Sequence, residues 1–318
     1  MIVGLSLLAG AGMAGWLVPG RLCALDLRRR DPVLLIACWL LSMLGVALAA
    51  VACVVMLLTP THGSVGTLFA AVDSCWTAIQ HGSPPAAEVF GGLLGMAVLG
   101  ALALRLVMVG ARGIRRRARV RREHLETLWF AGRPDGASPT ILWLVHDRPL
   151  AFSLGGKRGV IVATDALARH LDRDGVAAVL EHERAHLTGR HHQLIALADA
   201  LRAALPFLPL VRQAPDALRE LVELAADVVA TRKYGAPAVR AALVGVSGCG
   251  APTSGLAMAR DAVDLRLARL DGGALPPAGL RRVMACGAAG VTAAALPFVA
   301  SAVALLSIAI VDCPLTGI

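Results

Sequence analysis

Charged residues are scarce in this chain of 318 residues. Asp, Glu, Lys and Arg together make up 17% of it, whereas a soluble domain carries roughly 25%. Hydrophobic residues reach 57%. This composition excludes an ordinary soluble globule, and it equally excludes disordered, collagen-like and disulfide-scaffold proteins. The apolar excess indicates a membrane protein.

Lysine is almost absent, so arginine carries the positive charge. Lys157 and Lys233 are the only lysines in a chain of net charge +9. The densest arginine cluster lies in residues 112–122, directly after an apolar run, and contains no aromatic residue. Nucleic-acid-binding patches combine basic side chains with aromatic ones. We therefore expect no direct nucleic-acid binding and interpret this cluster as an anchor on the anionic headgroups of the lipid bilayer.

Four apolar runs carry at most one charge each. They are residues 2–18, 33–58 and 89–110 and a run within 283–311. A helix that crosses the hydrocarbon needs about 20 apolar residues, so we predict about four transmembrane helices. Arg105 stands near the end of the third run, and we expect its side chain to reach the interface. No Lys or Arg precedes Arg21, which argues against a cleaved signal peptide.

The positions of the arginines orient these helices. Three arginine-containing segments fall on one side of the predicted spans: 21–30, 112–122 and 281–282. The loop 59–88 contains no Lys or Arg. The positive-inside rule therefore predicts a multi-pass plasma-membrane protein, with both termini extracellular and residues 111–282 cytoplasmic. Cys75 and Cys313 then both lie outside the cell, where a disulfide could join them.

The cytoplasmic segment contains a pattern typical of short strands. Three apolar segments are separated by turn residues: 141–146, 151–154 and 160–163. Thr164 suits the N-cap of a short helix that follows, and Asp172 or Asp174 suits the N-cap of the next one. We therefore predict a small β-sheet followed by helices.

The second of these helices contains the motif HExxH, formed by residues 182–186. His182 and His186 are four residues apart and share one helix face, so both imidazoles can reach the same tetrahedral metal ion. Glu183 projects beside them, where it can take a proton from a metal-bound water. The motif predicts a site for one Zn²⁺ per chain.

A third ligand must come from another element. Glu223 and Asp227 share one face of a helix that we expect to begin near Pro215. Glu223 would bind the metal, and Asp227 would accept the N–H of a ligand histidine. Glu220, on the same helix, is a weaker candidate for the third ligand.

His192 is the alternative third ligand, because residues 182–192 also read HExxHxxGxxH, the metzincin pattern. It could bind only if Gly189 ends the helix, since an unbroken helix leaves His192 on nearly the opposite face. The chain has no Met between Met108 and Met258 that could form a nearby Met-turn. We therefore prefer Glu223 and interpret His191 and His192 as interface or surface residues.

The order of apolar spans, HExxH, a proline-containing turn at 207–211 and then ExxAD at 223–227 resembles the BlaR/MecR-type membrane zinc metallopeptidases. These are gluzincin-like enzymes related to the heat-shock and CAAX-prenyl membrane endopeptidases. The resemblance implies zinc ligands at His182, His186 and Glu223. It further implies Glu183 as the base and Asp227 in support.

The resemblance extends to residues 261–266, which look like the arginine-bearing segment after the site in relatives, so Arg266 is a further candidate. The antibiotic-sensing members carry an extracellular penicillin-binding domain after their last span. About seven residues follow the fourth run here, so we expect this protein to lack that sensor.

The expected fold class is a mainly α membrane protein with about four transmembrane helices and a cytoplasmic α+β zincin-like domain with a small β-sheet. We expect residues 1–111 to form a three-span membrane region. Residues 112–280 should form the metallopeptidase domain, and residues 281–318 a fourth transmembrane helix with a short extracellular tail.

These expectations define a zinc endopeptidase that acts on a protein or peptide at the cytoplasmic membrane face. The resemblance implies a transcriptional repressor as substrate. A non-catalytic signalling or scaffold protein with a structural metal site is one alternative, although structural sites need no glutamate such as Glu183. A site-two-type intramembrane protease is another, although charges such as Asp172 and Arg190 would not lie cheaply in hydrocarbon.

Overall fold

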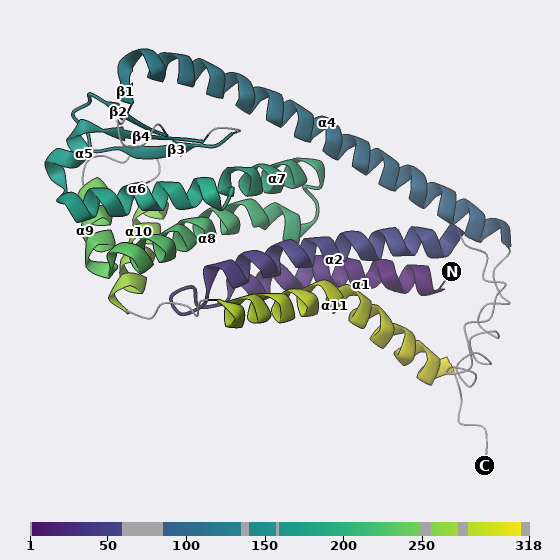
Figure 1. The fold of residues 1–318 in the computed structure, drawn as a ribbon. Coiled ribbons are helices and arrows are strands. Elements are labelled where there is room, and N and C mark those ends of the chain that lie inside the picture. The colour runs from purple at the N-terminus through teal and green to yellow at the C-terminus, as the bar shows by residue number, and fades with distance from the viewer. Residues whose placement is uncertain are drawn as a thin grey trace.

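The computed structural model describes residues 2–58, 85–134, 140–156, 159–247, 256–272 and 279–312. Three helices pack against one another along one side of the molecule: α1 (Ile2–Cys23), α2 (Pro32–Leu58) and α11 (Leu280–Asp312). A fourth helix, α4 (Pro85–Ala131), slants away from this bundle towards a small sheet (Figure 1). Cys75 and Cys313 lie outside the described residues, so their pairing stays a prediction.

Three helices are long and apolar enough to cross a membrane. The segments are Pro32–Val55 in α2, Leu93–Val120 in α4 and Leu280–Ser307 in α11. They support membrane association. In the part of the chain that the structure describes, α1 is not one of these helices, so the four-span layout and its orientation stay predictions.

Helix α4 continues without a break from its apolar half through the arginines of residues 112–122. The predicted domain boundary at residue 111 therefore falls inside one helix. At its far end α4 leads into the sheet. The strands are β1 (Gly132–Pro134), β2 (Ile141–Leu144), β3 (Ala151–Leu154) and β4 (Val160–Thr164).

The strand order is β1-β2-β4-β3, with β2 and β4 parallel and the other pairs antiparallel. Strand β1 was not predicted, because Gly132-Arg133-Pro134 has no apolar alternation. The small mixed sheet beside many helices agrees with the predicted α+β content.

Six helices follow the sheet. They are α5 (Asp165–His170), α6 (Arg173–Thr188), α7 (His191–Ala204), α8 (Pro209–Tyr234), α9 (Ala236–Ser247) and α10 (Leu256–Asp271). Asp172 caps α6 as predicted, since its Oδ1 accepts a hydrogen bond from the Gly175 N–H at 2.8 Å. Thr164 stands at the N-cap position of α5 but makes no side-chain cap there; its hydroxyl oxygen accepts the N–H of Leu150 instead, and the hydroxyl donates to the carbonyl of Arg148.

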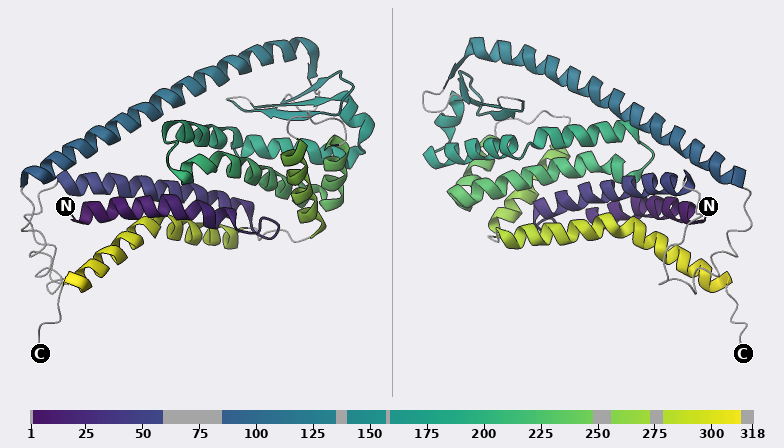
Figure 2. Two further views of the ribbon diagram at one scale, coloured as in Figure 1. Left: turned by 180° about the vertical axis from the view of Figure 1, so that it is seen from behind. Right: turned by 45° about the vertical axis from the view of Figure 1, so that its right-hand side comes forward.

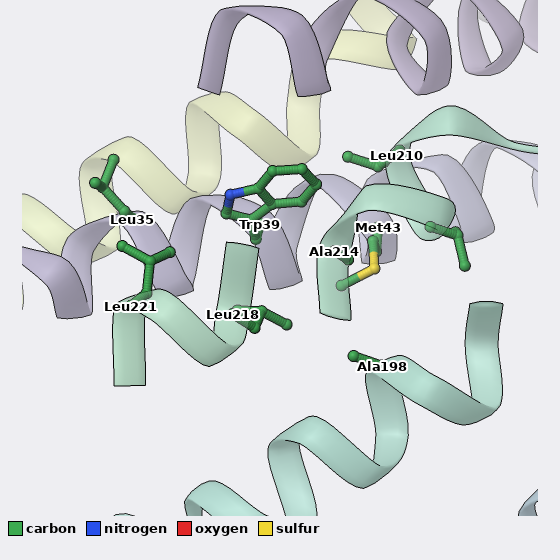
Figure 3. Close-up of a cluster of buried hydrophobic side chains, with 9 residues drawn as sticks. Leu35, Trp39, Met43, Ala198, Leu210, Ala214, Leu218 and Leu221 are labelled. Carbon is green, nitrogen blue, oxygen red and sulfur yellow. The ribbon is translucent and has the colours of Figure 1, made fainter. Parts of the chain in front are cut away.

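Helix α8 begins at Pro209, six residues before the predicted start, and Pro215 lies inside it. Pro209 occupies the first helical turn, where a missing N–H costs nothing. The extra turns are stabilised by burial, because α8 packs on α2 in an apolar cluster (Figure 3). The buried residues of this cluster are Leu35, Trp39, Met43, Ala198, Leu210, Val211, Ala214, Leu218 and Leu221.

Helices α6, α7 and α8 lie between the sheet and the α1–α2–α11 bundle (Figure 2). Polar contacts join α10 and α11 to the start of α2. Arg282 at the beginning of α11 binds Asp31 at 2.7 Å, and Arg269 of α10 donates to the carbonyls of Leu27 and Arg30. Helix α8 also contacts α1 and α2, so it is seated directly on this bundle.

Candidate metal centre

Helices α6 and α8 bring three predicted ligands together. The Nε2 atoms of His182 and His186 are 3.1 Å apart. Glu223 of α8 reaches both, with Oε2 3.3 Å from His182 Nε2 and Oε1 3.5 Å from His186 Nε2. Tetrahedral zinc with bonds of 2.0–2.2 Å requires donor atoms about 3.3–3.6 Å apart. The two distances to Glu223 lie within this range, and the distance between the histidines is about 0.2 Å below it. These residues therefore fit one zinc ion with little adjustment, and the fourth position of the tetrahedron would be left for water or substrate.

Asp227 and Arg266 support this cluster from behind. His182 Nδ1 donates to Asp227 Oδ1 at 2.9 Å, which leaves His182 Nε2 facing the other ligands. The Arg266 guanidinium of α10 donates one hydrogen bond to each carboxylate oxygen of Asp227, both at 2.7 Å. Its Nη1 lies 3.4 Å from Glu223 Oε2. Asp227 is only 3% exposed, and a carboxylate buried this deeply needs such a bidentate cation.

The two histidines have opposite electrostatic surroundings. Burial disfavours the charged form of His182, but hydrogen bonds to Asp227 and Glu223 outweigh burial and raise its pKa to about 9. Burial lowers the pKa of His186 to about 4; Glu223 opposes this shift, and the neighbouring histidines (His182, His191 and His192) add to it. His186 is therefore ready to bind a metal, whereas His182 must lose a proton to do so.

The structure also brings His191 to this centre. Helix α6 ends at Thr188, and Arg190 has a left-handed backbone with φ 52°. This break turns the chain back, so that the Nδ1 atoms of His191 and His186 are 2.9 Å apart. An added Cβ at Gly189 would collide with the His191 ring, so glycine leaves room for the ring in this position.

The position of the proton on His186 explains its contact with His191. A His186 that offers Nε2 to a metal carries its proton on Nδ1, and that N–H needs an acceptor. The Nδ1 of His191 is in place to accept it. The sequence interpretation of His191 as an interface or surface residue missed this contact.

His192 does not join the cluster, although α6 ends as that alternative required. Its Nε2 lies 3.3 Å from the hydroxyl of Ser153 on β3, and its ring centroid is 6.3 Å from that of His186. Glu220 lines the adjoining cavity instead of the cluster. Among the described residues, Glu223 is the carboxylate that meets both histidines.

Glu183 borders a cavity of about 1160 Å³. Burial raises the pKa of Glu183, and the nearby Glu223 adds to the rise, while His182 and hydrogen bonds from Ser153 oppose it. A carboxyl group shifted in this direction is better suited to accepting and returning a proton near neutral pH.

The walls of this cavity come from both halves of the molecule. Phe152 and Ser153 of β3, the edge strand of the sheet, line one side. Leu35 and Trp39 of α2 line another. The cavity beside Glu183 therefore lies between the sheet and α2.

Residues 115–240 match the model of peptidase family M48. This stretch contains α6, α7 and α8, and hence the cluster of His182, His186 and Glu223. The match supports a metallopeptidase of family M48, whose members are typically zinc-dependent. It does not distinguish the BlaR/MecR type from other members of the family. No curated protein and no solved structure matches the chain.

Arg266 lies beyond the residues that match the M48 model. Its contacts with Asp227 and Glu223 nevertheless connect α10 to the centre. The sequence resemblance made Arg266 a candidate, because relatives carry an arginine after the site. The ion pairs show that its side chain contacts Asp227 and Glu223.

Proposed function

We propose that this protein is a membrane-embedded zinc endopeptidase that hydrolyses peptide bonds at the cytoplasmic face of the membrane. The observation that carries the proposal is the convergence of His182, His186 and Glu223 at tetrahedral spacing beside a large cavity. The M48 match over the same helices supports the reaction class.

The residues have distinct roles in this proposal. His182, His186 and Glu223 would hold the zinc ion, which supplies Lewis acidity to the scissile carbonyl and to the attacking water. Glu183 would take the proton of that water and later give it to the leaving amine.

Three further residues would act through the ligands. Asp227 keeps the proton of His182 on Nδ1, and Arg266 balances the charge of Asp227. His191 would accept the Nδ1 proton of His186. All three would hold the imidazoles in the orientation that metal binding needs.

The cavity favours an extended peptide as substrate. Strand β3 lies at the sheet edge beside Glu183, and an edge strand can pair with an added peptide strand. The resemblance implies a repressor protein that is cleaved for regulation, and we propose such a repressor as the substrate. Among the described residues, α6 is not one of the helices suited to cross a membrane, which favours a site at the membrane surface over one within it.

The test is a comparison of the wild type with Glu183→Gln, both purified in detergent with zinc. We expect about one zinc per chain in both proteins and peptide cleavage only in the wild type. Equal cleavage by the variant would remove Glu183 from the mechanism. Stoichiometric zinc without cleavage of any peptide or repressor by the wild type would favour the scaffold alternative.

A further inference from the structure

The turn between α7 and α8 is apolar and projects outward. Residues 203–211 contain no charged side chain. Phe207 at the tip of this turn is 66% exposed. A large aromatic side chain at the tip of a helical hairpin, flanked by Pro206 and Pro209, is stabilised when it is removed from water.

Helices α1 and α2 give the position of this turn. Leu208 lies against Gly15 of α1, where an added Cβ would come within 2.6 Å of its side chain. Leu210 packs in the same cluster as Met43 of α2 (Figure 3). Met43 is 11 residues beyond Pro32 and hence about 16 Å along α2.

These positions set a depth relative to the bilayer. Helix α2 has 27 residues and is about 40 Å long, roughly 10 Å more than the hydrocarbon it would cross. If the excess lies wholly on the side of Pro32, Met43 is about 6 Å inside the hydrocarbon. If the excess is shared between both ends, Met43 is about 11 Å inside it.

Helix α4 provides an independent marker of the same depth. Arg105 lies near the end of the apolar run 89–110, and its Nη2 donates to the carbonyl of Ala203 at 3.2 Å. That carbonyl belongs to the last turn of α7 and has no partner within its own helix. In an apolar medium such a group must be satisfied, and a cation is favoured at a helix C-terminus. Arg105 thus binds the hairpin, which is a different role from the expected reach to the interface.

We propose that the α7–α8 turn is inserted into the leaflet from which α2 begins, with Phe207 among the lipid acyl chains. In the predicted topology this is the inner leaflet. Arg212, exposed just beyond the uncharged turn, would lie at the level of the headgroups, where its side chain can reach lipid phosphates. The inserted element is the shallow, interfacial kind that penetrates about 5–10 Å.

This insertion has a consequence for the metal centre. Glu223 is 14 residues from Pro209 on one continuous helix, so the two are separated by about 21 Å. Because Leu221 of α8 packs in the same cluster as Leu35 of α2, the centre lies close to the beginning of α2. A turn held in the lipid would therefore keep the centre at the membrane surface. The insertion itself does not rest on the proposed function.

The test places a nitroxide label at position 207 in protein reconstituted in nanodiscs of phosphatidylcholine and phosphatidylglycerol. The seven native cysteines are first replaced by alanine or serine, and Phe207→Cys is labelled. Val145, in the turn after β2, is the matched control, because it is apolar and 69% exposed. Collision of the label with oxygen and with a water-soluble nickel chelate then reports its depth.

We expect the label at 207 to collide several-fold more with oxygen than with the nickel chelate, at a depth of about 5–10 Å. The label at Val145→Cys should show the opposite ratio. Equal nickel accessibility at both positions would overturn the proposal, since the turn would then lie in water. Low accessibility to both reagents at 207 would also overturn it, because a protein surface would then cover the turn.

A second measurement keeps all native cysteines. Phe207→Trp and Val145→Trp are each reconstituted with lipids brominated on their acyl chains. The chain has five native tryptophans. We expect the tryptophan added at position 207 to raise the fraction of the total fluorescence that the bromines quench, and the one at 145, which adds only unquenched emission, to lower that fraction. An unchanged fraction for Phe207→Trp would contradict insertion even if the cysteine-free protein failed to fold.

Discussion

The α6–α8 contact and the α2–α8 contact use opposite chemistry on the same helix. Towards α6, helix α8 presents Glu223 and Asp227, and each carboxylate is paired with a histidine and with Arg266. Towards α2, its first half presents a purely apolar face to Trp39 and its neighbours. Directional pairs fix individual atoms, whereas apolar burial fixes only where the helix lies. Helix α8 therefore fixes the positions of the metal ligands on one face and packs against α2 on the other.

The largest expected effects come from breaking each contact in turn. Arg266→Ala leaves the Asp227 carboxylate buried without its cation, and we expect the free energy of unfolding to fall by about 3–5 kcal/mol. Trp39→Ala creates a cavity in the apolar contact and should cost about the same. Denaturant unfolding of zinc-free protein in detergent measures both changes.

Zinc affinity separates these two variants. Arg266→Ala should weaken zinc binding by about 10–100-fold, because Asp227 no longer orients His182, and Trp39→Ala should leave it unchanged. Arg240→Ala is the matched control, since Arg240 forms an exposed pair with Asp271 worth at most about 1 kcal/mol. Equal zinc affinity in the Arg266 and Trp39 variants would contradict the claim that the polar α6–α8 contact orients the ligands while the apolar α2–α8 contact only positions the helix.

At His191 we expect an effect on zinc affinity without the large loss of stability expected for Arg266→Ala. His191→Phe removes the acceptor for His186 Nδ1 while keeping an aromatic ring, and zinc affinity measured by chelator competition should fall by about 10–100-fold. Gly189→Ala should have the same effect by displacing the His191 ring. His192→Phe, one residue away, should bind zinc as the wild type does. A loss in the His192 variant alone would restore the metzincin-like alternative.

The smallest expected effect is a pH dependence at Glu181, which is buried on α6. Burial raises its pKa, but hydrogen bonds from Lys233 and Arg184 outweigh burial, so the pKa of Glu181 is lowered overall. Its folded-state pKa is then below the unfolded value of about 4.3. The stability it contributes is present above that value and is lost as the pH falls through the folded-state pKa. The difference in unfolding free energy between wild type and Glu181→Gln should therefore shrink below about pH 4, and a difference independent of pH would argue against this pairing.

Sequence patterns predicted the short-range features best. Strand β3 runs over Ala151–Leu154 as expected, and Asp172 caps α6. The spacing in HExxH places His182 and His186 on one face because helix geometry is local. The convergence of Glu223 with these histidines depends on how α8 packs against α6. The order of the motifs suggested Glu223 as a ligand but did not predict this packing.

The features that sequence reasoning missed depend on tertiary contacts. Pro215 lies inside α8 because burial against α2 outweighs the hydrogen bond that proline removes. The contact of His191 depends on the left-handed conformation of Arg190, which no nearby residue type demands. Arg105 binds the end of α7, and an isolated apolar run gives no sign of such a partner.

Zinc content after mutation of Glu223 or of His192, the two main candidates for the third ligand, tests the central claim most directly. Wild type, Glu223→Ala and His192→Ala are loaded with zinc, desalted against a weak chelator and analysed for bound metal. If Glu223 is the third ligand, we expect about one zinc per chain in the wild type and in His192→Ala, and almost none in Glu223→Ala. Full zinc content in Glu223→Ala, together with its loss in His192→Ala, would contradict it.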